Sequence, residues 1–201
     1  MSDEELARES QAGSVAAFEV LVSRYERRVH AFAAQCCGNA AEAGDVAQEA
    51  FVRAFQAIGQ YNPGRSFAAW LFTIARRKAI DRHRSAPVIA EEPVPEGAEV
   101  QDPAEILARA EERQALWALA RRSLPPLQYQ VIWLRYAEEL SVADIATVLR
   151  RTRVHVKVLL FRARRSLAQA LGAATRRSEA TGSGRRPVMP GSISRLKPSV
   201  P

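Results

Sequence analysis

Residues 45–84 read DVAQEAFVRAFQAIGQYNPGRSFAAWLFTIARRKAIDRHR. The fold of the chain can be worked out from this segment. Two runs of apolar residues at helical spacing lie in it, separated by the turn-rich residues 59–64. Each run predicts an amphipathic helix with one buried face. The buried faces are expected to hold, in the first helix, Ala47, Ala50, Phe51, Ala54 and Ile58, and in the second, Phe67, Trp70, Leu71, Ile74 and Ala75.

The outward faces of these two helices differ in charge. In the first helix the outward face is acidic and polar, and it holds Asp45, Gln48, Glu49 and Val52. The second helix has Ser66 as its N-cap and ends in the basic residues Arg76, Arg77, Lys78, Arg82 and Arg84, opposed by Asp81. A polar face followed by a basic, aromatic-rich helix indicates a module that holds a protein on one side and nucleic acid on the other.

The motifs D-x-x-Q-E-x-F, P-G-R-S-F-x-x-W-L-x-x-I-A-R and I-D-x-x-R in this stretch resemble conserved region two of bacterial sigma factors. They are most similar to the short, extracytoplasmic-function (ECF) type of the sigma-70 family. The resemblance implies that the outward face of the first helix binds the clamp helices of the largest RNA polymerase subunit. Those residues are Asp45, Gln48, Glu49 and Val52.

The same resemblance implies that the loop and the second helix melt and read the minus-ten promoter element. The implied DNA-binding residues are Tyr61, Asn62, Arg65, Trp70, Arg76, Arg77, Lys78 and Arg84. For Trp70 the apolar stripe favours a place in the core instead. The family often has Asn where this chain has Arg77, so the promoter preference stays open.

The residues before this stretch are also predicted to be helical. Ser2 and Glu5 form a capping box that begins a short helix, which ends near Gln11. Ser14 can cap the next helix, whose apolar stripe begins at Phe18. Residues 1–84 are therefore expected to form one all-α bundle of about four helices.

Several kinds of site and several environments are not indicated by the sequence. Cys36 and Cys37 are adjacent, which disfavours a disulfide between them, so reduced, buried thiols of a cytoplasmic protein are expected. His30, His83 and His155 lack the spacing of metal ligands. No cofactor is expected, and no apolar run is long enough for membrane insertion. No glycine-rich phosphate loop or nucleophile–base motif indicates an enzyme.

The rest of the chain divides into three parts that differ in their charged residues. Residues 85–101 are rich in proline and acidic residues and are predicted to be a linker. Residues 102–171 form the second predicted domain, and from residue 109 onward it holds twelve basic and five acidic side chains, which suits a polyanion. Residues 172–201 lack an apolar stripe and are expected to be a disordered basic tail.

The second domain has the pattern of a helix-turn-helix. Helices are predicted from Asp102 to Ser123 and from Leu127 to Ala137. A short helix from Ser141 to Leu149, a tight turn and a longer helix from Arg153 to Leu171 follow. The expected core of the motif is Ile145, Ala146, Val156, Leu160, Ala163 and Leu167. A plain helical hairpin is the alternative interpretation of this pattern.

This domain resembles region four of the same family through L-P-P-L-Q-Y-Q-V-I-x-L-R-Y, S-V-A-D-I-A and V-K-V-L-L-F-R-A-R-R-S-L. The resemblance implies binding to the minus-thirty-five element and to the flap of the second-largest polymerase subunit. The implied DNA-binding residues are Arg153, His155, Lys157, Val158, Phe161, Arg162 and Arg165.

The outward side of the predicted recognition helix departs from the family. It presents Val154, Val158 and Phe161, where the family usually has small or polar residues, and the turn has Arg150 where the family usually has Gly. Two explanations remain open. The apolar side chains meet thymine methyl groups while basic neighbours hold phosphates, or a protein partner covers the face.

Together the motifs predict an ECF-type sigma factor, which binds core RNA polymerase and directs promoter recognition, DNA melting and transcription initiation. The alternative is a helix-turn-helix regulator that binds DNA without acting as a polymerase subunit. The expected partners are core polymerase and promoter DNA, with an anti-sigma factor as a further candidate.

Overall fold

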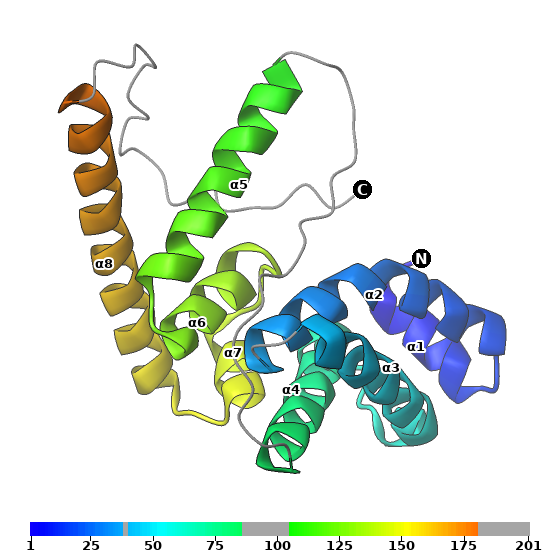
Figure 1. Cartoon of the computed structure of the whole chain (residues 1–201). Coiled ribbons are helices and arrows are strands. Elements are labelled where there is room, and N and C mark those ends of the chain that lie inside the picture. The colour runs from blue at the N-terminus through cyan, green and yellow to red at the C-terminus, as the bar shows by residue number, and fades with distance from the viewer. Residues whose placement is uncertain (38–39, 86–104, 181–201) are drawn as a thin grey trace. The chain divides into compact units, whose positions relative to one another are not determined.

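The computed structural model describes residues 1–37, 40–85 and 105–180. Every regular element in these ranges is a helix, which confirms the predicted all-α class. The described residues form two compact units (Figure 1). The first unit holds residues 1–85 together with residues 143–151, and the second holds residues 105–142 and 152–180.

Four α-helices and one 3₁₀ turn make up residues 1–85 of the first unit. They are α1 (Asp3–Gln11), α2 (Val15–Cys37), α3 (Ala40–Ala57), η1 (Ile58–Gln60) and α4 (Phe67–Ser85). Helices α2, α3 and α4 pack against one another, and α1 packs on α2 (Figure 1). The predicted four-helix bundle is present because each helix places its apolar stripe inside it.

The helix ends follow the predicted capping residues. Ser2 and Glu5 form the expected capping box, with Glu5 N–H donating to Ser2 Oγ at 3.2 Å and Ser2 N–H donating to Glu5 Oε2 at 2.7 Å. Gly13 ends α1 with φ of 99°, a conformation that costs glycine little. Ser14 then caps α2 by accepting the Ala17 N–H at 3.2 Å.

Helix α1 fastens the segment that leads into α4. The Gln11 side-chain amide donates to the carbonyl oxygens of Ile58 at 2.9 Å and Tyr61 at 2.7 Å. The Glu4 carboxylate accepts the Phe67 N–H at 3.3 Å, at the N-terminus of α4, where a negative charge is favoured. These hydrogen bonds from the N-terminal helix hold the loop between α3 and α4 in place.

An aromatic cluster fills the core of this bundle. Phe32 and Phe72 are fully buried, with ring centroids 5.2 Å apart. Tyr25 lies edge-on to Phe67 at 5.6 Å and to Phe72 at 6.3 Å. Edge-to-face pairs of this kind add to the free energy gained by burying the rings.

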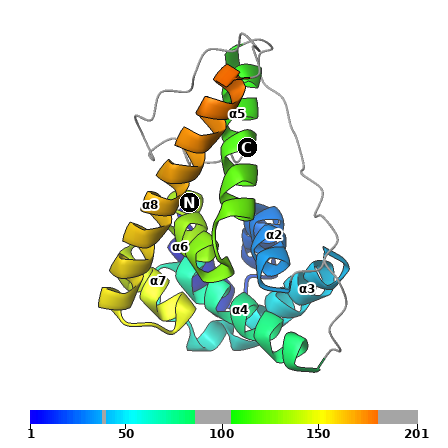
Figure 2. The same ribbon diagram turned by 60° about the vertical axis from the view of Figure 1, so that its left-hand side comes forward.

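The second unit contains α5 (Glu105–Ser123), α6 (Pro126–Tyr136) and α8 (Arg153–Ala180). Helix α8 packs on both α6 and α5 (Figure 2). The Trp117 ring of α5 meets the Tyr129 ring of α6 edge-on, with centroids 6.0 Å apart. Four residues of the predicted helix-turn-helix core belong to this unit and are buried: Val156, Leu160, Ala163 and Leu167. The other two, Ile145 and Ala146, belong to the first unit and are also buried.

The prediction that the last helix ends at Leu171 is wrong, because α8 continues to Ala180. Gly172 is followed by the good helix formers Ala173 and Ala174, and no proline interrupts the run. The predicted helix start at residues 102–104, most of the linker and the tail from residue 181 lie outside the described residues.

Helix α7 (Val142–Leu149) ends in a turn that glycine usually makes. Arg150 has φ of 51°, in the left-handed region, and its N–H donates to Thr147 O at 3.2 Å. The Arg151 N–H donates to Ala146 O at 2.9 Å, which completes a Schellman motif.

We expect Arg150→Gly to stabilise the chain by about 0.5–1 kcal/mol, because a side chain in the left-handed region is strained. A rise in Tm of about 1–4 °C in thermal unfolding followed by circular dichroism checks this. Arg151→Gly is the matched control, since it removes the same charge at a residue without positive φ. Equal effects of the two substitutions would show that charge rather than backbone strain is responsible.

Candidate functional site

The polar face of α3 is on the surface, as its periodicity predicts. Asp45, Gln48, Glu49 and Val52 are all exposed, and Val52 is 52% exposed although it is apolar. Their spacing places them on one side of the helix. The opposite side is buried and holds Val46, Ala47, Ala50, Phe51 and Ala54.

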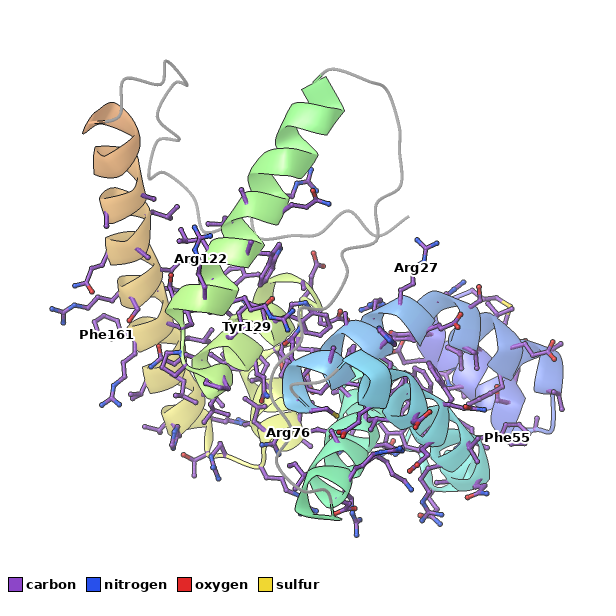
Figure 3. All side chains as sticks on the ribbon, in the orientation of Figure 1. Arg27, Phe55, Arg76, Arg122, Tyr129 and Phe161 are labelled. Carbon is purple, nitrogen blue, oxygen red and sulfur yellow. The ribbon has the colours of Figure 1, made fainter. Side chains whose placement is uncertain are left out.

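Phe55 extends this face and was not among the candidates drawn from the sequence. It is 45% exposed (Figure 3). Its ring lies edge-on to the Phe18 ring, with centroids 5.0 Å apart. It follows Val52 by three residues, so the two apolar side chains adjoin at the end of the polar face. That spacing was the signal in the sequence that could have identified Phe55.

The loop before α4 is built around a buried tyrosine. Tyr61 is 3% exposed, and its ring contacts the Phe67 and Trp70 rings at centroid distances of 5.6 and 5.2 Å. Its hydroxyl donates to the Arg65 carbonyl oxygen, and burial raises the pKa of this hydroxyl to about 12. In this conformation Tyr61 therefore shapes the loop and offers little ring surface to a ligand.

The polar residues of this loop are arranged by backbone bonds. The Asn62 side chain accepts the Gly64 N–H at 2.9 Å, and the Arg65 N–H donates to Asn62 O at 3.0 Å. Asn62 and Arg65 remain exposed. Ser66 caps α4 as predicted, by accepting the Ala69 N–H at 3.2 Å.

Trp70 is half-buried and belongs to the aromatic group formed with Tyr61 and Phe67. Its ring centroid is 5.7 Å from that of Phe67. The packing agrees with the interpretation that Trp70 anchors the core at the start of α4. Through its contact with Tyr61 it also supports the loop that carries Asn62 and Arg65.

Two cations of α4 lie against the polar face of α3. The Arg82 guanidinium contacts Asp45 at 2.6 Å and Glu49 at 3.1 Å, and the Lys78 ammonium contacts Glu49 at 3.3 Å. These four side chains are between 34% and 60% exposed, so each pair contributes at most about 1 kcal/mol. The predicted polymerase-binding and DNA-binding residues thus meet on one charged surface.

Arg82 is a second residue of this surface, after Phe55, that was not predicted to belong to the site. It pairs with both carboxylates of the α3 face, although 37 residues separate it from Asp45. The signal in the sequence was its spacing, because Arg82 follows Lys78 by four residues and so shares its side of α4.

The other basic residues of α4 have different surroundings. Arg77 is 73% exposed and lies 3.9 Å from Asp81. Arg76 is half-buried, and burial lowers the pKa of its guanidinium. Arg84 lies in the last turn of α4, beyond the side chains that the structure describes.

The two cysteines are protected thiols. Burial raises the pKa of the Cys36 thiol to about 12 and that of the Cys37 thiol to about 11. Thiolates are therefore scarce at neutral pH, and thiolates are the reactive form. This chemistry gives neither cysteine the character of a nucleophile or a redox sensor.

The candidate residues of α8 are all exposed. Thr152 caps this helix by accepting the His155 N–H at 3.2 Å. The exposed candidates are Arg153, His155, Lys157, Val158, Phe161, Arg162 and Arg165. The helix thus presents cationic and apolar side chains together on one surface.

No group of three or more His, Cys, Asp or Glu side chains within residues 1–37, 40–85 and 105–180 could hold a metal ion. Among the same residues, no helix combines the length and the apolar character that crossing a membrane requires.

Models of two protein families match the chain. The model described as Sigma-70 region 2 matches residues 21–87, and that described as Sigma-70, region 4 matches residues 118–167. The first match includes all of α3 and α4, and the second includes α6, α7 and the first half of α8.

Whole proteins are similar to this chain as well. It is 34% identical over 172 residues to the ECF RNA polymerase sigma factor BldN of Streptomyces coelicolor, across 83% of this chain and 65% of that protein. It is 33% identical over 180 residues to the RNA polymerase sigma-H factor of Pseudomonas aeruginosa, across 84% of this chain and 93% of that protein.

Solved structures with a similar fold include CnrH in its complex with the cytosolic domain of CnrY. That likeness has a TM-score of 0.59 at 26% identity and covers 85% of this chain and 97% of CnrH. The sigma factor RpoE in its complex with the anti-sigma factor NepR from Bartonella quintana is similar in fold alone. There the TM-score is 0.62 at 21% identity, and the likeness covers 79% of this chain and 98% of RpoE.

Proposed function

The chain belongs to the sigma-70 family of RNA polymerase sigma factors, in its ECF group, and from this premise we propose how its surfaces bind polymerase and promoter DNA. It acts as a dissociable initiation subunit that directs core polymerase to promoters and carries no active site of its own. The observation that carries this function is the presence of both sigma regions, in order, in one chain.

Core polymerase docks on the outward face of α3. Asp45, Gln48 and Glu49 supply carboxylate and amide oxygens, and Val52 supplies an exposed apolar contact of the kind found at interfaces. Phe55 adjoins this face and enlarges its apolar end. A stand-alone helix-turn-helix regulator would have no use for such a face.

Promoter DNA is held and opened by the loop before α4 and by the basic end of α4. Asn62 and Arg65 are exposed in the loop, and Arg77 extends from α4 into solvent. Lys78 and Arg82 belong to the same helix but share the carboxylates of α3. Docking of polymerase onto those carboxylates would therefore leave these two cations available to phosphates.

The direct test is transcription in vitro with core polymerase and genomic DNA fragments, followed by start-site mapping. Initiation at defined sites only when the chain is present supports the function. If the chain binds DNA but never changes where core polymerase initiates, it is a helix-turn-helix regulator instead.

Arg76→Ala combined with Arg77→Ala should slow the formation of open complexes, because two cations are lost beside the melted strand. The dependence of log rate on log salt should become shallower by about one to two units, since each phosphate contact contributes about one unit or less. Arg27→Ala in α2 is a control that removes an exposed charge elsewhere. If the double variant keeps the wild-type rate and salt slope, Arg76 and Arg77 do not contact promoter DNA.

An anti-sigma factor is the further partner that we propose. CnrH was solved in a complex with a domain of CnrY, and RpoE in a complex with an anti-sigma factor. Because polymerase and promoter DNA are its working partners, the chain is proposed to act in the cytoplasm. Co-purification of a tagged chain from its own cells, before and after inducing stress, tests for such a partner.

A further inference from the structure

Three exposed apolar side chains form a stripe along the first half of α8. Val154 is 71% exposed, Val158 is 41% exposed and Phe161 is 65% exposed. Their spacing of four and then three residues places them in one line on the helix surface. Figure 3 shows Phe161 projecting from α8 on the side away from α5 and α6.

The stripe lies opposite the buried side of the same helix. The buried side holds Val156, Leu159, Leu160, Ala163 and Leu167. At about 100° per residue, the centre of the stripe is about 180° from the centre of this buried side. The stripe is therefore no part of the core, and an apolar line so placed marks a binding surface.

Basic residues accompany the stripe on both of its sides. At helical spacing, Lys157 lies on one side, His155 and Arg162 lie on the other, and Arg165 continues the line one turn beyond Phe161. No acidic residue occurs in the sequence from residue 153 to residue 178. Arg164 is engaged elsewhere, because its Nε donates to the Tyr136 hydroxyl at 2.8 Å.

The first turn of α8 has the wrong charge for helix stability. Acidic residues are favoured at a helix N-terminus, yet this one has Arg153 and His155 and no acidic residue. The Arg153 guanidinium there repels the positive end of the helix dipole unless an anion is present. This surface therefore fits a polyanion better than a protein partner, which would have to neutralise the same cations with its own carboxylates.

We propose that Val154, Val158 and Phe161 read thymine methyl groups in the major groove of the upstream promoter element. This inference rests on the proposed function and adds which chemical group of the promoter bases the chain recognises. The 5-methyl group of thymine is the apolar feature that distinguishes this base in the major groove. The flanking cations hold the phosphates on either side.

The length of the stripe sets the length of the element that it reads. Phe161 follows Val154 by seven positions, which is about 10 Å along a helix at 1.5 Å per residue. With base pairs about 3.4 Å apart, this distance spans about three base-pair steps. The element is expected to carry thymines, on either strand, within about four consecutive base pairs.

The test uses complete holoenzyme and a promoter whose start site has been mapped. Equilibrium binding is measured on two templates, one natural and one with deoxyuridine replacing each thymine of the upstream element. Uracil keeps the carbonyl oxygens of thymine and lacks only the methyl group. The variants are Val158→Ser and Phe161→Ser, compared with Val20→Ser as the matched control, because Val20 in α2 is also 41% exposed.

On the thymine template, each α8 variant should bind about three- to tenfold more weakly than the Val20→Ser control, as expected for a lost apolar contact. On the uracil template the same loss should shrink to less than about twofold, because the methyl group that each side chain contacts is already absent. Wild-type holoenzyme should itself bind the uracil template more weakly.

Equal losses on the two templates would reject methyl recognition. So would wild-type binding by both variants, which would assign the stripe to a protein partner. In either case promoter-directed initiation by the wild-type chain would leave the proposed function intact. A wild-type chain that never directs initiation would overturn both.

Discussion

Replacing both carboxylates of the α3 face, Asp45→Ala with Glu49→Ala, is expected to weaken binding to core polymerase by on the order of ten- to a hundredfold. The two side chains are exposed on one side of α3, and no core packing depends on them. Helix content should stay unchanged because alanine is a strong helix former. Titration of core polymerase with a fluorescently labelled chain measures the affinity.

Arg82→Ala provides the control that the structure makes necessary. It removes the ion pairs of Arg82 with both carboxylates and leaves only the pair between Lys78 and Glu49. If the carboxylates act by contacting polymerase, Arg82→Ala should leave core affinity within about twofold, because exposed pairs contribute little. An equal loss in the two variants would mean that the pairs merely order the surface, and the docking assignment would fail.

Phe72→Ala is expected to have the largest effect on stability, about 3–5 kcal/mol. The ring is fully buried and packs edge-on against Phe32 and Tyr25, so its removal leaves a cavity and breaks two aromatic contacts. Urea unfolding followed by circular dichroism measures the change as a lower transition midpoint.

Phe161→Ala is the matched control for this measurement, because it deletes the same ring from a position that is 65% exposed. Its effect on unfolding should stay within about 0.5 kcal/mol. A loss of stability at Phe161 as large as that at Phe72 would contradict the packing described for both rings.

Much of the helical structure could be predicted because its causes are local. The capping box of Ser2 and Glu5, the cap at Ser66 and the apolar stripes depend on residues that are near one another in sequence. The end of α8 could not be placed in this way. Gly172 indicates an end, but the alanines that follow it favour continuation, and local propensity alone does not decide between them.

The exposure of the candidate site residues could be predicted only in part. Asp45, Gln48 and Glu49 are exposed as their periodicity requires, and the basic residues of α4 follow the aromatic ones. Tyr61, however, was expected at a DNA-binding surface and is 3% exposed. An aromatic residue in a loop carries no periodic signal, so the sequence could not say whether its ring points into the core.

The sequence alone predicts most of the helices, their buried sides, the order of the two sigma regions and the apolar stripe of Val154, Val158 and Phe161. Only the tertiary structure decided which side chains from distant segments meet. It brought Arg82 to Asp45 and Glu49, and Gln11 to the carbonyl of Tyr61. The physical reason is that helical periodicity fixes the side of a helix on which a residue lies, whereas the packing of whole helices selects the neighbour on that side.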